Sequence, residues 1–172
     1  MRVQVAGAEQ MRALGARIAA LLAPGDLVVL GGPLGAGKTT LVQGIGAGLG
    51  VRGPITSPTF VIARVHPSLR GGPDLVHADA YRLDSRLEVD DLDLDADLDH
   101  SVTVVEWGEG LVETLASAHL LVDISRPAAP AGSWSDSDEG GGDQERSVTL
   151  TGHGLRWTRA ARSLAAAVSG QD

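Results

Sequence analysis

The feature that most constrains this chain is a glycine-rich segment at residues 32–39, GPLGAGKT, which matches the pattern G-x-x-x-x-G-K-[ST] in full. A short apolar run at residues 26–30 precedes it, and a helical pattern at residues 38–49 follows it. In such a strand, loop and helix unit, the glycines let backbone N–H groups surround a phosphate at the helix N-terminus. The segment therefore predicts a phosphate-binding loop in an α/β fold, and a site for a nucleoside triphosphate.

The loop also predicts individual roles for its residues. Lys38 is expected to reach the β- and γ-phosphate oxygens, and the Thr39 hydroxyl is expected to ligate Mg²⁺. The residues expected to bind the nucleotide are Gly32, Leu34, Gly35, Ala36, Gly37, Lys38, Thr39 and Thr40.

The rest of the chain carries further strand and helix patterns. Apolar and β-branched runs predict strands at residues 3–5, 59–65, 74–80, 101–107, 119–124 and 146–151. Helical spacing of apolar residues predicts helices at residues 8–22 and 155–168. A length of 172 residues fits one compact domain over residues 1–172. Residues 126–145, rich in Pro, Gly, Ser, Asp and Glu, predict a flexible low-complexity insertion within that domain.

Composition and charge exclude several classes of function. The formal net charge of −8 argues against a protein that coats nucleic acid non-specifically. The chain has no cysteine, which excludes disulfides, thiolate zinc sites, iron–sulfur clusters and a cysteine nucleophile. It shows no secretory signal pattern and no apolar run of about 18 residues, so we expect a cytoplasmic protein with no membrane partner.

A phosphate-binding loop needs an acidic partner at the end of a neighbouring strand, to hold Mg²⁺ or order an attacking water. Two residues fit this role, since Glu106 ends one apolar run and Asp79 ends another. The alternative for each is a solvated carboxylate at a strand end. Spacing alone does not decide between the two candidates.

Two further segments concentrate functional residue types. The first, SPTF at residues 57–60, is either an ordinary strand entry or a switch-like loop whose hydroxyls approach the γ-phosphate. The second, HADAYR at residues 77–82, holds the chain's single tyrosine. Strand alternation there predicts His77, Asp79 and Tyr81 on one face, with Arg82 pairing an acid or a phosphate. The alternative is a half-buried edge strand.

An aspartate-rich segment at residues 90–99 superficially resembles a calcium loop. Ala96 stands where that loop needs glycine and Val102 where it needs glutamate, so we exclude calcium binding. The segment predicts a solvated acidic surface, with docking of a basic partner as its functional interpretation.

Taken together and in this order, four motifs resemble the TsaE family of small P-loop ATPases of bacterial tRNA threonylcarbamoyladenosine biosynthesis. They are GPLGAGKTT at residues 32–40, SPTF at residues 57–60, HADAYR at residues 77–82 and VEW at residues 105–107. The similarity extends over residues 5–124. It implies a single-domain P-loop NTPase fold with a mixed central β-sheet flanked by helices, which binds ATP and Mg²⁺ and hydrolyses ATP slowly by itself.

The resemblance also implies partners. Family members associate with the TsaD and TsaB subunits, which transfer the threonylcarbamoyl group to N6 of adenosine 37 of tRNA. ATP binding and hydrolysis by the small ATPase are expected to reset that complex between turnovers. The chain is therefore expected to meet tRNA through the complex rather than alone.

Residue roles follow from the same resemblance. It implies that Lys38 neutralises phosphate charge, and that Thr39 and Glu106 ligate Mg²⁺. Asp79 is the better candidate for positioning the attacking water. The residues to which the motifs give a switch or coupling role are Ser57, Thr59, His77, Tyr81, Arg82 and Trp107. Adenine contacts are expected around Ala8 and Glu9.

Two other functions use the same loop. A small-molecule kinase normally carries an arginine-rich lid that excludes water, and no such segment is visible in this sequence. A nucleotide-gated interaction module would differ from an ATPase only in which step is functional. Addition of partners distinguishes these alternatives, because it should raise turnover only in a partner-dependent ATPase.

Overall fold

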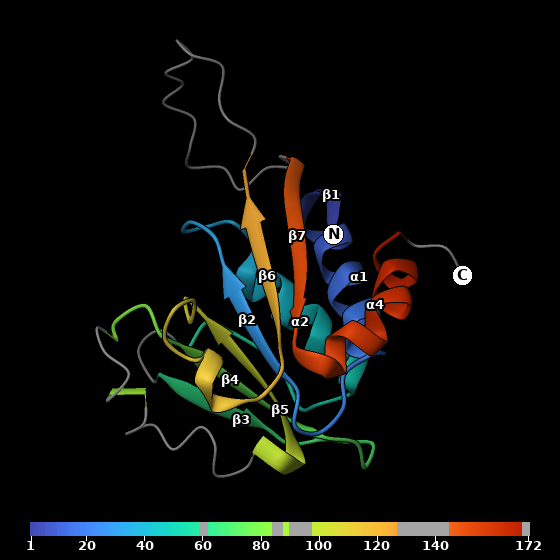
Figure 1. Ribbon diagram of the computed structural model, residues 1–172. Helices are drawn as coiled ribbons and strands as arrows, with labels where there is room; N and C mark the ends of the chain where they lie inside the picture. The colour runs from blue at the N-terminus through green and yellow to red at the C-terminus, as the bar shows by residue number, and fades with distance from the viewer. Residues whose placement is uncertain (59–61, 84–87, 90–97, 127–144, 170–172) are drawn as a thin grey trace.

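A computed structural model of the chain describes residues 1–58, 62–83, 88–89, 98–126 and 145–169 (Figure 1). Thr59, most of the aspartate-rich segment and the interior of the predicted insertion lie outside the described residues.

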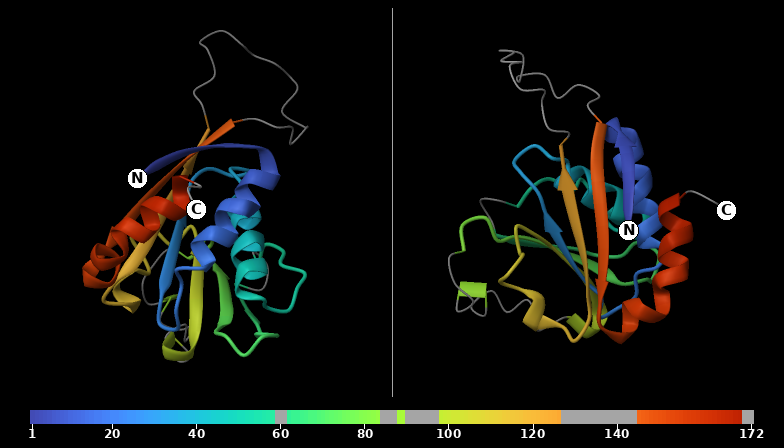
Figure 2. Two further views of the ribbon diagram at one scale, coloured as in Figure 1. Left: turned by 90° about the vertical axis from the view of Figure 1, so that its right-hand side faces the viewer. Right: turned by 45° about the horizontal axis from the view of Figure 1, so that its top comes forward.

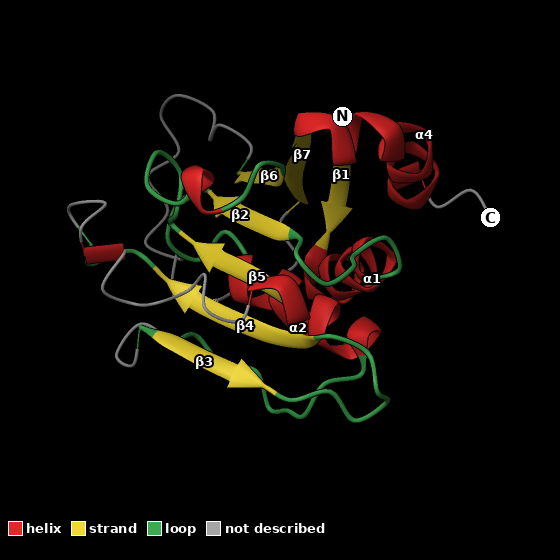
Figure 3. Cartoon of the chain, turned by 60° about the horizontal axis from the view of Figure 1, so that its bottom comes forward, coloured by secondary structure: helices red, strands yellow, loops and turns green. Residues whose placement is uncertain are grey.

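Seven strands form one mixed sheet in the order β1-β7-β6-β2-β5-β4-β3. They span Arg2–Ala6 (β1), Leu27–Gly31 (β2), Ala63–His66 (β3), Asp74–Asp79 (β4), Ser101–Glu106 (β5), His119–Ser125 (β6) and Glu145–His153 (β7). The central strand β2 pairs in parallel with both β5 and β6, and β4 pairs in parallel with β5. Figure 3 shows β2, β4 and β5 running the same way and β3 running against them. The predicted α/β fold with a mixed sheet is confirmed.

Helices flank this sheet, as expected. The elements are the α-helices Gly7–Ala19 (α1), Lys38–Leu49 (α2) and Gly154–Ser169 (α4), and the 3₁₀ helices Leu98–His100 (η1) and Glu113–Leu115 (η2). All three α-helices contribute to one apolar core with the same face of the sheet. Figure 2 shows α1 side by side with α2. The two helices can approach closely because Gly15 and Gly44 have no Cβ. A Cβ on Gly15 would collide with the Leu41 carbonyl, and one on Gly44 with the Arg12 carbonyl.

The opposite face of the sheet carries a second, smaller core. Leu27, Val29 and Val105 point to this side and pack with residues from the connections, among them Val112 and Val89. Because β2 and β5 are apolar on both faces, the sheet's centre is buried on both sides, as is usual for parallel strands.

The parallel strands bring four carboxyl ends to one edge of the sheet. In the register, Asp79 of β4 lies beside Glu106 of β5, which in turn lies beside Leu30 of β2. On the other side of β2, Gly31 pairs with Asp123 of β6. The loop after β2 therefore lies between the end of β5 and the end of β6, which is where α/β sheets bind ligands.

Some predicted boundaries were wrong. Helix α1 ends at Ala19 rather than at residue 22, because a tight turn follows in which Asp26 accepts a hydrogen bond from the Ala23 N–H (2.8 Å). Strand β3 begins at Ala63, since Ile62 has a φ of +71° that leaves the extended conformation. The two end residues of the predicted insertion, Arg126 and Glu145, are described, and Glu145 belongs to β7; the insertion itself stays a prediction.

None of the helices in the described part of the chain is long and apolar enough to cross a membrane.

Candidate phosphate-binding site

The glycine loop adopts a conformation that only glycine permits at its two ends. Gly32 has a φ of +120°, and a Cβ there would collide with the Ile124 carbonyl on β6. Gly37, with a φ of +108°, is the N-cap of α2. The left-handed conformation of Gly37 turns the chain into the helix, so that the N-terminus of α2 opens directly onto the loop.

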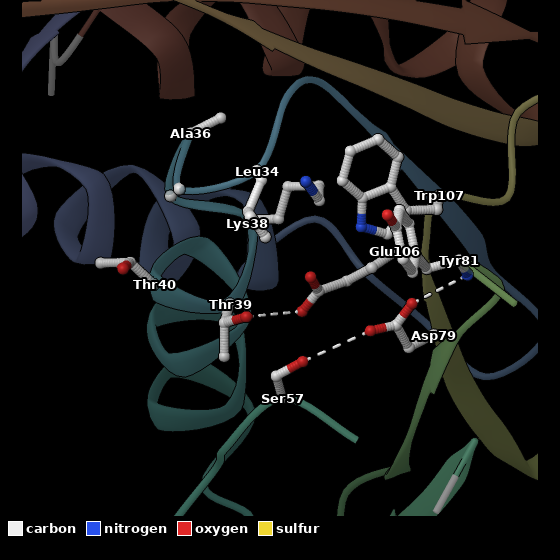
Figure 4. A pocket seen from close by; sticks show the side chains of 12 residues that line it. Leu34, Ala36, Lys38, Thr39, Thr40, Ser57, Asp79, Tyr81, Glu106 and Trp107 are labelled. Atoms are coloured by element: carbon white, nitrogen blue, oxygen red, sulfur yellow. Dashed lines mark hydrogen bonds between the residues drawn. The ribbon is translucent and has the colours of Figure 1, made fainter. Parts of the chain in front are cut away.

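A pocket of about 400 Å³ lies in front of this loop (Figure 4). Its lining residues are Leu34, Gly35, Ala36, Gly37, Lys38, Thr39, Thr40, Ser57, Asp79, Tyr81, Glu106 and Trp107. The structure thus brings together most residues singled out from four separate motifs. Three others lie outside the lining: Gly32 starts the loop, His77 is buried beneath the site, and Arg82 is exposed beyond it.

Lys38 is held by the loop itself. Its ammonium donates to the carbonyl oxygens of Gly32 (2.8 Å) and Pro33 (3.0 Å), and lies 3.7 Å from the ring centre of Trp107. Burial lowers the pKa of Lys38, and the charges of Glu106 and Asp79 partly oppose this by raising it. Lys38 is also the only lysine of the chain, so every other side-chain cation of fixed charge is an arginine.

Glu106 is the acidic residue closest to the start of α2. It is only 3% exposed, and one of its oxygens, Oε1, accepts a hydrogen bond from the Thr39 hydroxyl (2.8 Å) and contacts His77 Nε2 (2.9 Å). An ionised carboxylate accepts only, so Nε2 is the donor of the second bond. Both partners belong to regular elements, α2 and β4, which fix the carboxylate firmly.

Asp79 lies next to Glu106 in the sheet but has different partners. It accepts hydrogen bonds from the Ser57 hydroxyl (3.3 Å) and from the Tyr81 N–H (2.9 Å), as Figure 4 shows. The prediction that Tyr81 continues the strand was wrong. Strand β4 ends at Asp79, whose carboxylate stabilises a turn, and Tyr81 is 62% exposed with its ring 5.1 Å from that of Trp107.

The residues present fit a magnesium ion of the type that nucleotides carry. Within the described ranges, no group of three or more His, Cys, Asp or Glu could hold a metal alone. Thr39 and Glu106 supply one hydroxyl and one carboxylate oxygen at the mouth of the loop. Mg²⁺ commonly uses one or two protein oxygens and completes its shell with phosphate oxygens and water.

Trp107 combines two unusual features. Its backbone has a φ of +61°, which is rare for a residue other than glycine and is concentrated at functional sites. The backbone N–H of Trp107 donates to the Leu30 carbonyl (2.9 Å), which anchors the residue to the base of the glycine loop. The Trp107 ring lies against the Lys38 ammonium, a contact that the sequence alone does not reveal.

Two points concern residues that do not line the pocket. Ala8 and Glu9, for which adenine contacts are predicted, are exposed in the first turn of α1 and do not line the pocket, so their role stays a prediction. Sequence reasoning missed Arg126, whose guanidinium donates to the Leu34 carbonyl in the loop (3.1 Å). The signal available in the sequence was only that Arg126 directly follows a predicted strand, because the place of that strand beside β2 is known from the structure alone.

A glycine loop between β2 and α2, with carboxylates at the ends of adjacent parallel strands, defines a protein of the P-loop NTPase fold. The family model described as "Threonylcarbamoyl adenosine biosynthesis protein TsaE" matches residues 5–131. The chain belongs to the TsaE family.

Similar proteins agree with this assignment. A tRNA threonylcarbamoyladenosine biosynthesis protein TsaE of Streptomyces coelicolor is 58% identical over 151 residues, which cover 87% of this chain and 95% of that protein. The protein of that name from Bacillus subtilis is 35% identical over 150 residues, covering 87% and 84%. A crystal structure of Bacillus subtilis YdiB superimposes with a TM-score of 0.71 at 29% identity, covering 96% of this chain and 93% of that one.

Proposed function

We propose that this protein is a Mg²⁺-dependent ATPase that supports tRNA N6-threonylcarbamoyladenosine biosynthesis. The observation that carries the proposal is the hydrogen bond between Thr39 and Glu106 at the mouth of the glycine loop (2.8 Å). A hydroxyl and a carboxylate oxygen in contact at this place form a ready pair of magnesium ligands beside the expected β- and γ-phosphates. Membership of the TsaE family supports the pathway.

Each residue of the pocket has a task in this proposal. The loop N–H groups bind the phosphates, and the Lys38 ammonium leaves its two carbonyl partners to neutralise phosphate charge. Thr39 and Glu106 hold Mg²⁺, which when bound neutralises charge that develops on the phosphates. Asp79, which lines the pocket beside Glu106, orients the attacking water.

The proposed role in the pathway is that of a resetting ATPase. In this proposal the chain acts in the cytoplasm with the TsaD and TsaB subunits, and meets tRNA through their complex. Differential binding of its ATP and ADP states to the partners supplies the free energy for resetting. The exposed Tyr81, whose ring contacts Trp107 and through it Lys38, offers a route from the nucleotide to the surface.

The experiment that tests the proposal measures ATP turnover by the purified chain, first alone and then with TsaD, TsaB and tRNA. Formation of threonylcarbamoyladenosine is followed in parallel over many cycles. We expect slow hydrolysis alone, faster hydrolysis with partners, and modification that continues beyond one turnover. ATP consumption only when a small acceptor is supplied would instead identify a kinase, and unchanged turnover with partners would contradict the proposed role.

Lys38→Ala is the matching variant for nucleotide binding. Among the described residues that line the pocket, Lys38 is the one cation, so we expect its removal to abolish productive ATP binding. Arg70→Ala is the control, because Arg70 is an exposed cation beside Gly50, at the opposite end of α2. Equal affinities of the two variants for ATP would contradict the assignment of Lys38.

A further inference from the structure

Arg126 approaches the glycine loop from the side opposite the two carboxylates. It directly follows β6, the parallel neighbour of β2 on the side away from β5. Its Nη2 atom donates to the Leu34 carbonyl at 3.1 Å and lies 2.6 Å from where a Cβ on Gly35 would be. Arg126 is not among the residues that line the pocket, but its guanidinium contacts two that do, Leu34 and Gly35.

This contact fixes the direction of one peptide group. In a trans peptide the C=O and the following N–H point in opposite directions. Because the Leu34 carbonyl points at Arg126, the N–H of Gly35 points away from Arg126, and Gly35 is one of the residues that line the pocket.

The backbone N–H of Gly35 has no hydrogen-bond acceptor among the described residues. The next amide, that of Ala36, donates to the Pro33 carbonyl (3.1 Å). A donor without an acceptor, on a glycine that lines the pocket, is available to a phosphate oxygen.

We propose that Arg126 is a positioning residue for nucleotide binding, which locks the Leu34–Gly35 peptide so that the Gly35 N–H is aimed at the bound phosphates. The inference rests on the proposed function, because it takes the pocket to hold a nucleotide. The arginine acts through the loop and need not touch the nucleotide itself. Its charge also polarises the peptide that it holds, which strengthens the N–H as a donor.

The surroundings of Arg126 support this assignment. Among the described residues, no carboxylate forms an ion pair with it. Arg146, at the start of the adjoining strand β7, is a second cation nearby: burial lowers the pKa of Arg146, and the charge of Arg126 lowers it further. Arg126 brings positive charge to the loop, where the phosphates of the proposed nucleotide would carry negative charge.

The test compares Arg126→Ala and Arg126→Lys with the wild type. Affinities for ATP, ADP and AMP are measured together with the rate of hydrolysis at saturating ATP. Arg70→Ala is the matched control, because Arg70 is also an exposed arginine packed against a glycine with a φ of +70°, at the far end of α2. In the wild type and in Arg126→Ala, the Gly35 amide resonance is followed by NMR during an ADP titration.

We expect Arg126→Ala to weaken ATP and ADP binding alike, by about tenfold, since both contain the β-phosphate. AMP affinity and the saturated rate should stay near the wild-type values, and the large shift of the Gly35 amide on ADP addition should be lost. Arg126→Lys keeps a charged donor and should recover most of the affinity.

Three results would overturn the inference. Unchanged ATP and ADP affinities in Arg126→Ala would show that the contact is incidental. A loss confined to ATP would show direct contact with the γ-phosphate instead of positioning. If the Gly35 amide resonance shifts equally on ADP addition in the wild type and in Arg126→Ala, then the Leu34–Gly35 peptide does not need Arg126 to hold its orientation. Failure of the wild type to bind nucleotide would refute the proposed function first, and is scored separately.

Discussion

Glu106 and Asp79 lie side by side at the ends of two parallel strands, yet they are held in different ways. Glu106 contacts a buried histidine of β4 and a threonine of α2, and both belong to regular elements. Asp79 contacts the exposed Ser57 and the backbone of the exposed Tyr81, in connecting segments. The comparison indicates that a carboxylate fixed by the scaffold suits a metal ion, whereas one held by loops can follow the state of the nucleotide.

The largest effect is expected for Glu106→Gln. This variant keeps the size of the side chain but removes the charge that the proposed Mg²⁺ needs. We expect Mg²⁺-dependent hydrolysis to fall by up to about 1000-fold, while nucleotide binding through the loop and Lys38 persists in part. Phosphate release and nucleotide affinity, measured over a range of Mg²⁺ concentrations, check this. Turnover equal to that of the wild type would refute the metal assignment.

Asp79→Asn is the next variant, and it makes the comparison direct. The amide keeps an acceptor for the Tyr81 N–H but loses the negative charge that orients a water. We expect hydrolysis to fall by roughly 100-fold, with the Mg²⁺ requirement unchanged. The same phosphate-release assay measures both quantities. If the Mg²⁺ requirement rises as much as in Glu106→Gln, then the two carboxylates share one role and the distinction is wrong.

His77 tests how far the fixed position of Glu106 matters. Its Nε2 donates to the carboxylate from a fully buried position, and its Nδ1 has no partner among the described residues. His77→Leu removes the donor, so we expect the Mg²⁺ concentration for half-maximal activity to rise by roughly tenfold.

His77→Gln is the matched control for this change, because it carries an N–H donor that can reach the carboxylate. It should recover part of the Mg²⁺ affinity, while circular dichroism and thermal melting monitor the fold of both variants. A Leu variant with native folding and a native Mg²⁺ requirement would show that Glu106 needs no such support.

The pKa of Lys38 measures how strongly the charge of each carboxylate acts on this lysine. Burial lowers the pKa of Lys38, and the charge of Glu106 opposes this more than that of Asp79 does. Removing either charge therefore lowers the pKa of Lys38 further, and Glu106→Gln should lower it more than Asp79→Asn. Only the protonated lysine attracts phosphate, so nucleotide affinity should fall by a few-fold as the pH rises through the pKa of Lys38. Among the wild type and the two variants, Glu106→Gln should show this fall at the lowest pH.

The single lysine makes this measurement simple. Lysine labelled with ¹³C in the side chain gives one lysine side-chain spectrum, whose shift during a pH titration reports the pKa of Lys38 directly. If Asp79→Asn lowers the pKa of Lys38 more than Glu106→Gln does, then Asp79 and not Glu106 has the stronger effect on the lysine charge.

Local patterns in the sequence were enough to predict the strand, loop and helix that bind phosphate. Residues 38–49 coincide with α2, because the motif fixes the start of the helix and Gly50, in the left-handed conformation, ends it. The strands that end at Asp79 and Glu106 were also predicted within one residue, since both carry apolar residues on both faces, as buried parallel strands do.

What the sequence could not predict depends on which strands are neighbours. The pairing of Asp79 with Glu106 follows from β4 lying beside β5, and the contact of Arg126 with Leu34 from β6 lying beside β2. Both contacts join residues distant in the chain, so no local pattern encodes them. Arg126 was further obscured because it begins a stretch of low-complexity composition. Tyr81 was misplaced because the Asp79 side chain ends the strand by a turn.

Ser57→Ala should have the smallest effect and tests the loop side of the comparison. The Ser57 hydroxyl is exposed and its hydrogen bond to Asp79 is long, at 3.3 Å, so its loss should lower hydrolysis by only about threefold. Ser57→Thr keeps the hydroxyl and should behave as the wild type, and the Mg²⁺ requirement should not change in either variant. A loss as large as that of Asp79→Asn would mean that Asp79 works only when residue 57 holds it. In that case the loop gates catalysis, and Asp79 depends on its partner more strongly than Glu106 does.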